Sequence, residues 1–140
     1  MKILLAVDGS EGSTRAARQV VTFVRALRKQ PAVIVLNADP ALMSSVAIRL
    51  GAEETARQHA QSSEAALKPA RAVLRRARID FSEERRIGDA GPAIATFAAE
   101  NKCDLIVMGS HGRTGLANLV KGSVTMKVIG LGSVPVLVVR

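Results

Sequence analysis

Short apolar runs alternate along this chain with longer segments whose apolar residues recur at helical spacing. Ile3–Val7 and Leu105–Met108 are continuous apolar runs, which is the composition expected of strands buried on both faces of a sheet. After the first run, Ala16, Val20 and Val24 recur every four residues, as on the buried face of a helix. Strands that alternate with helices need crossover connections, and these produce a mainly parallel sheet. The pattern therefore predicts an α/β fold with helices on both faces of the sheet.

Five strands are expected, and the third has the weakest pattern. In Ile79–Ile87, apolar residues alternate with polar ones before the charged segment Glu83–Arg86, a composition typical of a sheet edge. Arg85 and Arg86 are interpreted as residues that protect this edge from pairing, and not as a binding site. The remaining strands are expected at Ala32–Leu36 and Val134–Val139.

The region from Ala41 to Arg78 is rich in Ala, Glu, Gln and Arg, so it is predicted to be mostly helical. Gly51 and Pro69 are its two weak points. As an alternative, the first part forms a loop that covers a ligand-binding cleft. Pro69 alternatively begins a separate turn or a kink. His59, in the middle of this polar stretch, is interpreted as a solvated side chain.

A single domain over residues 1–140 is expected, because this length and 48% hydrophobic residues suffice for a core. The one cysteine, Cys103, excludes a disulfide framework and a multi-cysteine zinc site. It precedes an apolar strand and is interpreted as a small buried residue. The longest uncharged stretch, Val128–Val139, contains glycines and a proline and is too short to span a membrane. We expect a soluble, cytoplasmic protein without a membrane segment.

The chain is basic, with 20 Lys and Arg against 12 Asp and Glu and a net charge of +8. Such a balance favours anionic partners: nucleotides, nucleic acids or acidic lipids. The absence of Trp and Tyr and the presence of only three Phe leave few platforms for base stacking, which argues against nucleic acid. The densest basic group, Arg71 to Arg78, shares a predicted helix with alanines and is interpreted as a solvated face.

Two loops and one helix start occupy the places where parallel sheets bind ligands. Asp8–Ser10 follows the first strand, Gly109–Gly115 follows the fourth, and Gly122–Thr125 begins the last helix. Ligands of open α/β sheets lie beyond the carboxyl ends of the strands, where strand order reverses. Glycines allow a close backbone approach, and free N–H groups in loops and at helix starts bind anions. Ser123 and Thr125 add hydroxyl donors, so the set suits a triphosphate.

The spacing excludes other phosphate-binding patterns. The chain has no Gly-Lys dipeptide for a Walker-type loop and no G-x-G-x-x-G after the first strand. Asp8 has no acidic neighbour two residues away, which argues against paired-aspartate phosphatases. Turn glycines and an aspartate that caps the next helix are the structural alternatives, but the cleft position favours a ligand role for Asp8. His111 is interpreted as shaping its loop, because no catalytic partner is evident.

These residues resemble the universal stress protein family. Its ATP-binding subgroup carries glycine, two residues, glycine, nine residues, glycine, and then serine or threonine. Here two residues separate Gly109 from Gly112, nine separate Gly112 from Gly122, and Ser123 follows. The resemblance spans the whole chain but is weak from Ala41 to Glu84. The segments similar to the family's first strand, fourth strand with its loop, and last strand are Ile3–Ser10, Cys103–Gly112 and Pro135–Val139.

The resemblance implies a Rossmann-like sheet of five parallel strands in the order 3-2-1-4-5, which would bring Asp8 and Gly109 to one cleft. In relatives that bind ATP, the aspartate contacts the nucleoside end, and the loop after strand four and the Gly-Ser helix start hold the phosphates. Ala38 stands where the family often has a larger valine, so adenine packing is expected to be looser. The matched binding positions are Ala6, Asp8, Ala38, Met108, Gly109, Ser110, Gly112, Gly122, Ser123, Val124 and Thr125.

The residues and the resemblance together predict an ATP-binding, nucleotide-responsive stress or signalling protein, with Mg²⁺ on the phosphates. The family also implies a homodimer that pairs through the last strand, and an apolar, β-branched final strand fits such an edge. No catalytic base or acid pair is evident, so turnover is expected to be absent or slow. One alternative is a slow ATPase or phosphotransferase that uses the same cleft, with Asp8 holding the metal. The other is a nucleotide-independent protein that binds an acidic partner through its basic surface.

Overall fold

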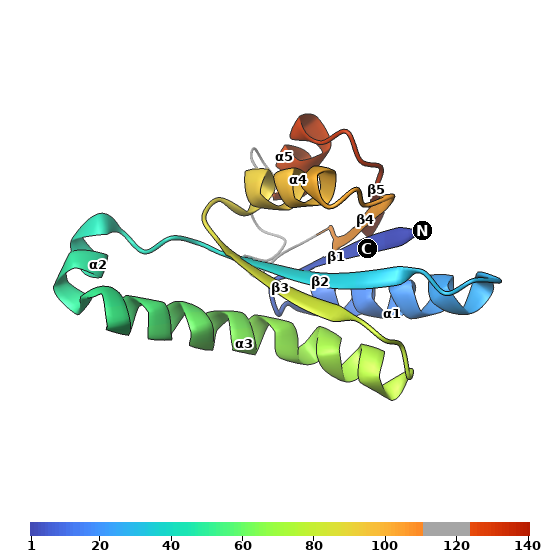
Figure 1. Cartoon of the computed structure of the whole chain (residues 1–140), viewed down its shortest axis with the longest axis horizontal. Helices are drawn as coiled ribbons and strands as arrows, with labels where there is room; N and C mark the ends of the chain where they lie inside the picture. Colours follow the sequence, from blue (N-terminus) through green and yellow to red (C-terminus); the bar gives the residue numbers. More distant parts are fainter. Residues whose placement is uncertain (111–123) are drawn as a thin grey trace.

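Five parallel strands lie side by side in the order 3-2-1-4-5, which confirms the expected Rossmann-like sheet (Figure 1). The computed structural model describes residues 1–110 and 124–140. The strands are β1 (Lys2–Val7), β2 (Ala32–Asp39), β3 (Ser82–Ile87), β4 (Leu105–Gly109) and β5 (Val136–Val139). The helices are α1 (Glu11–Ala26), α2 (Ser44–Leu50), α3 (Ala52–Arg76), α4 (Ala90–Glu100) and α5 (Val124–Leu131).

Alternate residues of the central strands feed two hydrophobic cores, one on each face of the sheet. Ile3 and Leu5 of β1 pack with α1 and α3, whereas Leu4 packs with α4 and α5. Figure 1 shows these two helical layers below and above the sheet. Successive side chains of a strand point to opposite faces, so a strand covered on both faces needs the continuous apolar run that the sequence carries.

The β3 edge is charged, and its two arginines have partners within the chain. The strand begins at Ser82, three residues later than the sequence pattern indicated, because Ile79 is buried in the core below the sheet. Arg85 donates to Glu64 of α3 at 2.9 Å. The guanidinium of Arg86 lies 4.8 Å from the centre of the Phe97 ring in α4. These contacts hold the two arginines against the helices on opposite faces of the sheet, and their protective role at the edge stays a prediction.

The region after β2 is helical in two pieces that meet at Gly51, where φ is +81°. α2 has no buried residue, and with the start of α3 it extends past the carboxyl ends of the strands (Figure 1). α3 continues through Pro69, which cannot donate to the carbonyl of Ala65. Burial of Leu67 and Ala70 on both sides of the proline stabilises the helix there. Within the described residues, no helix is long and apolar enough to cross a membrane.

The amino ends of β1 and β4 are bound to each other. The Lys2 backbone N–H donates to the Asp104 carboxylate at 2.6 Å, and the Asp104 N–H donates to the Lys2 carbonyl at 2.8 Å. The Lys2 ammonium donates to the Asn101 carbonyl at 2.6 Å. Cys103 is buried, as expected from its position, and burial raises the pKa of its thiol.

Candidate functional site

A cavity of about 370 Å³ lies at the carboxyl ends of the strands, across the β1–β4 boundary where the strand order reverses. This volume falls within the range of small-molecule sites. Gly112, Gly122 and Ser123 lie outside the described residues. All of the other predicted binding residues line the cavity: Ala6, Asp8, Ala38, Met108, Gly109, Ser110, Val124 and Thr125.

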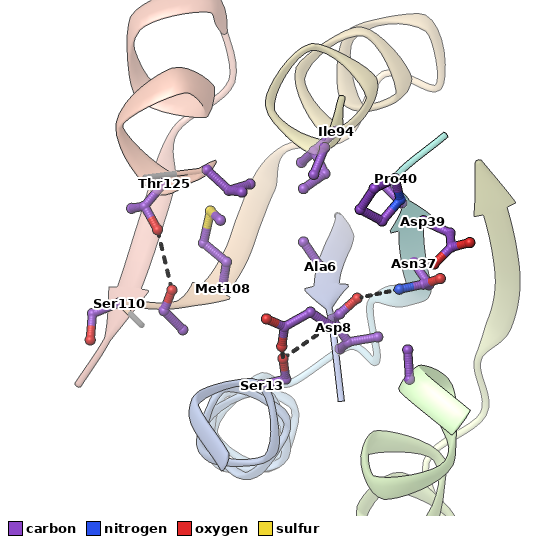
Figure 2. Close-up of a pocket in the computed structure, with 16 residues that line it drawn as sticks. Ala6, Asp8, Ser13, Asn37, Asp39, Pro40, Ile94, Met108, Ser110 and Thr125 are labelled. Carbon is purple, nitrogen blue, oxygen red and sulfur yellow. Dashed lines mark hydrogen bonds between the residues drawn. The ribbon is translucent and has the colours of Figure 1, made fainter. Parts of the chain in front are cut away.

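Asp8 is held in a tight turn between β1 and α1. Its Oδ1 accepts hydrogen bonds from the Ser10 N–H at 3.0 Å and from the Ser13 hydroxyl at 2.5 Å. Ser10 is the N-cap of α1 and accepts from the Ser13 N–H at 3.1 Å. The turn role and the cavity role therefore coexist, because Asp8 orders the turn and also lines the cavity (Figure 2).

Glycines bring α1 and α3 against the cavity. A Cβ added to Gly109 would lie 2.6 Å from the carbonyl carbon of Gly12, at the start of α1. A Cβ added to Gly9 would lie 3.0 Å from the Cα of Ala66 in α3, and Gly9 has a φ of +81°. Gly9 and Gly109 therefore have a structural reason to be glycine, because a larger residue would collide with the backbone of α3 or α1. This reason is independent of any contact with a ligand.

The β4 and α5 side of the cavity is joined by hydrogen bonds. The Thr125 hydroxyl donates to the Gly109 carbonyl at 3.3 Å, and the Ser110 N–H donates to the Val139 carbonyl at 2.8 Å. Next to the cavity, Lys127 of α5 donates to Asp89, the N-cap of α4, at 2.8 Å. This bond lowers the pKa of the Asp89 carboxyl. The Thr125 bond therefore joins α5 to the end of β4, and the Lys127 bond joins α5 to the start of α4.

The end of β2 supplies lining residues that the sequence analysis missed. Asn37 is buried, and its Nδ2 donates to the Val7 carbonyl at 2.9 Å (Figure 2). Its Oδ1 has no hydrogen-bond partner among the described residues. The sequence feature that could have identified these lining residues is the change from apolar to polar residues at the end of β2, at Asn37 and Asp39. The lining residues not predicted are Val7, Ser13, Asn37, Asp39, Pro40, Ala66, Ala90 and Ile94.

His59 is buried, so the expectation of a solvated side chain was wrong. It is 7% exposed, and its Nδ1 lies 2.5 Å from Oδ2 of Asp39, which is itself 8% exposed. The Ser62 hydroxyl donates to the other Asp39 oxygen at 2.6 Å. A buried carboxylate at the end of β2 needs donors, and α3 supplies them from one face because His59 and Ser62 are three residues apart.

The cavity combines an apolar wall with oxygen acceptors. Ala6, Ala38, Ile94 and Met108 belong to or pack against the core above the sheet. Asp8 lies beside Ala6 at the end of β1, across the cavity from Ile94 (Figure 2). No lysine, arginine or histidine is among the described lining residues. Within residues 1–110 and 124–140, no cluster of three or more metal-ligating side chains occurs. Such a site suits a flat apolar ring with polar groups at its edge.

Three comparisons relate the chain to known proteins. Residues 1–140 match the sequence model of the universal stress protein family. The chain is 29% identical to universal stress protein MJ0531 of Methanocaldococcus jannaschii, over 99% of this chain and 81% of that protein. It is similar to the solved structure of MJ0577 from the same organism, at 28% identity and a TM-score of 0.78, covering 99% and 94% of the two chains. A universal stress protein from Archaeoglobus fulgidus in complex with dAMP has a TM-score of 0.73 at 23% identity, covering 100% and 98%.

Proposed function

Because the chain belongs to the universal stress protein family, we propose that it binds an adenine nucleotide in the cavity at the carboxyl ends of β1 and β4. The observation that carries this proposal is the convergence of Asp8, Gly109 and Thr125 on one cavity, although they are far apart in the sequence. The dAMP complex of the similar Archaeoglobus fulgidus protein supports an adenine nucleotide as the ligand class.

In the proposed complex, the base lies against the apolar wall formed by Ala6, Ala38 and Met108. The nucleoside end faces Asp8, and the phosphates extend past Gly109 toward the start of α5. The small side chains at the ends of β1 and β2 leave room for a purine, and the backbone N–H groups in the first turn of α5 are suited to donate to the phosphates.

ATP with Mg²⁺ is the proposed physiological ligand. Mg²⁺ usually keeps several waters and is held by substrate phosphates with one or two carboxylates. It therefore does not need a dedicated cluster of protein ligands, and the oxygens of Ser110 and Thr125, on the proposed phosphate side of the cavity, fit a metal that arrives on the nucleotide. The ion would neutralise phosphate charge, which the described lining side chains do not do.

The proposed role is a nucleotide-responsive stress or signalling module that works as a homodimer through β5. Backbone groups of Pro135 and Val139 are bonded to β4, so Val136 and Val138 direct theirs toward the open edge. The four β5 side chains are half-buried and apolar. Sedimentation of Val138→Pro, which removes an outward N–H and keeps the β4 ladder, should show a monomer if the edge pairs with a second copy. An unchanged sedimentation coefficient would contradict this assembly.

The binding proposal is tested by calorimetry on protein stripped of nucleotide. We expect saturable binding of Mg-ATP that is lost in Gly122→Val, at the phosphate end of the predicted motif. Gly130→Val is the matched control, because a Cβ at Gly130 meets no atom within 4 Å. Absence of heat with every adenine nucleotide would overturn the proposal. Where Mg-ATP binds, ADP formation proportional to protein concentration would identify the slow ATPase instead.

A further inference from the structure

Two basic segments that are far apart in the sequence lie at the amino end of the sheet, opposite the cavity. Residues 25–30 include the end of α1, and residues 75–80 include the end of α3. Together the two segments contain six Lys and Arg and one Asp. All six cationic side chains are exposed. We call them the amino-end basic patch, and they are Arg25, Arg28, Lys29, Arg75, Arg76 and Arg78.

The fold brings the ends of α1 and α3 to the same side of the molecule. Each helix leads into the amino end of a strand, and these strands, β2 and β3, are parallel neighbours. Val24 and Leu74, which directly precede Arg25 and Arg75, are buried in the same hydrophobic core. In Figure 1 both helices end on the side that carries the amino terminus, away from α2. Because packed helices lie about 8–10 Å apart, the two segments form one surface.

The turn after α3 is fixed by backbone bonds and by burial. The Arg78 N–H donates to the Arg75 carbonyl at 3.0 Å, and the Ile79 N–H donates to the Leu74 carbonyl at 3.1 Å. Ile79 is 7% exposed and belongs to the core between the sheet and the two helices. Burial of Ile79 therefore anchors the turn and leaves Arg78 at the surface.

The positive charge of the patch has no counter-charge within the described part of the chain. Among residues 1–110 and 124–140, none of the six cations forms an ion pair. In contrast, Arg71, one turn earlier on α3, is bonded to two glutamates. The helix dipole accounts for cations in a last turn, where Arg25, Arg75 and Arg76 lie. It does not account for the three cations that follow the helices.

We propose that the amino-end basic patch binds the phosphate backbone of a nucleic-acid duplex without reading its sequence. Five of the six cations are arginines, whose guanidinium groups bond phosphate oxygens in a bidentate manner. A duplex carries one negative charge about every 1.7 Å along its axis, so a surface as wide as two packed helices meets several phosphates. The absence of Trp and Tyr argues against base stacking, but contacts with the backbone do not need aromatic residues.

The composition of the patch suits a duplex better than a membrane. Leu27, which is 37% exposed, is the one large apolar side chain that is exposed among residues 25–30 and 75–80. Membrane attachment grows with the apolar area that enters the lipid, in addition to the attraction between charges. Binding to a duplex backbone requires only the cations, and the patch supplies little else.

The salt dependence of binding tests the proposal. Fluorescence anisotropy is measured with a labelled DNA duplex of mixed sequence and with an RNA duplex of the same length, and the tighter binder identifies the duplex form. Six phosphate contacts predict a slope of about −5 for the logarithm of the association constant against the logarithm of salt concentration. Affinity should then fall about a thousandfold between about 50 mM and 200 mM salt. A slope shallower than about −3 for both duplexes, or no binding at the lowest salt, would overturn the inference.

Two paired variants divide the patch between its helices. Arg25→Gln with Arg28→Gln removes two charges from the α1 segment, and Arg75→Gln with Arg76→Gln removes two from the α3 segment. Each pair should reduce the magnitude of the salt slope by about 2, since two fewer phosphates are neutralised. Glutamine forms helices about as well as arginine, and circular dichroism checks that both variants fold. A reduction in only one pair would contradict a surface that the two helices share.

Arg49→Gln with Arg140→Gln is the matched control. It removes the same charge from two exposed residues, in α2 and after β5, both beyond the carboxyl ends of the strands. The salt slope should stay unchanged in this variant. An equal reduction in the control and in the patch variants would assign binding to the net charge of the chain and would contradict the proposed surface.

Two further measurements separate this inference from a membrane role and from the proposed function. Vesicles of phosphatidylserine and phosphatidylcholine should bind the natural chain more weakly than the duplex does, at about 0.15 M ionic strength. Tighter binding to the vesicles, weakened in both patch variants, would replace the duplex by a membrane. Adenosine affinity should be the same in the natural chain and in both patch variants, because the cavity lies at the other end of the sheet. Adenosine binding without duplex binding would therefore overturn this inference and leave the proposed function intact.

Discussion

The two ends of the sheet differ in how their strands are filled. At the amino end and the centre, Ile3, Leu4 and Leu5 of β1 are fully buried between the two helical layers. At the carboxyl end, the same faces carry Ala6, Ala38 and Gly109, and a cavity replaces the core. The difference teaches that the cavity arises from small residues at the last positions of neighbouring strands, and not from a missing helix.

This arrangement separates stability from binding. Removal of side-chain volume should be costly at the filled end, and addition of volume should abolish binding at the open end. Both ends are bordered by ion pairs or charged hydrogen bonds, Lys2 with Asp104 at one and Lys127 with Asp89 at the other. Substitutions that remove volume at the filled end, or add volume at the open end, test whether stability and binding depend on different ends of the sheet.

Leu4→Ala should have the largest effect on folding. Leu4 is completely buried among residues of α4 and α5, and truncation of such a leucine lowers the free energy of unfolding by about 3 kcal/mol. Urea unfolding followed by circular dichroism measures the loss, with adenosine affinity of the folded fraction as the control. A loss below about 1 kcal/mol would show that this end is packed less densely than its burial indicates.

Gly109→Ala should lower both the stability of the fold and the affinity for adenosine, because Gly109 packs against α1 and also lines the cavity. The added Cβ would lie 2.6 Å from the Gly12 carbonyl carbon, so α1 must shift, at a cost of about 2 kcal/mol in unfolding free energy. Gly130→Ala is the control, since its Cβ meets nothing within 4 Å. Equal midpoints of chemical unfolding for the two variants would contradict the close packing of α1 on β4.

Ala38→Leu should weaken adenosine binding about tenfold, or about 1.4 kcal/mol, while the free energy of unfolding changes by less. The larger side chain occupies the cavity rather than a packed core. Ala32→Leu places the same substitution at the exposed start of the same strand and should leave adenosine affinity unchanged. Similar affinities for both variants would exclude the apolar wall as the base site.

Arg71→Gln should have the smallest effect, at the filled end. Arg71 bonds both Glu64 and Glu83, and these bonds lower the pKa of each carboxyl. Because the folded state favours the ionised carboxylates, the variant should unfold at a slightly lower urea concentration at neutral pH. This difference should shrink as pH falls through the lowered pKa values, since both carboxylates are then protonated. A pH-independent difference in urea midpoint would assign the effect to packing of the arginine stem.

The core and the glycine loops were accessible from the sequence because they depend on local pattern. A continuous apolar run such as Ile3–Val7 indicates a strand buried on both faces, and a loop that follows it must lie at the carboxyl edge. The strand order was predicted from the resemblance to a family, because local pattern does not fix which strands are neighbours. The start of β3 was misplaced because Ile79, although strand-like in composition, belongs to the core before the strand begins.

The β2 end and its contact with α3 could not be predicted in the same way. Asp39 and His59 are separated by 20 positions, and no local pattern fixes which face of α3 meets the sheet in a helix so rich in alanine and polar residues. His59 has polar neighbours in the sequence, so its burial depends on the register of helix against strand. Tertiary packing determines that register, and Asn37 was overlooked for the same reason.

α3 is a single helix but has two stability regimes. None of the residues from Ala52 to Gln58 is buried, and His59 is the first buried residue along the helix. Amides before His59 should exchange with deuterium through local fraying, whereas those around Leu67 should exchange only in global unfolding. The boundary between these foldons lies where the helix is bonded to the pocket wall. A ligand that fills the pocket should therefore slow deuterium exchange of the α3 amides before His59, although these amides do not contact the ligand.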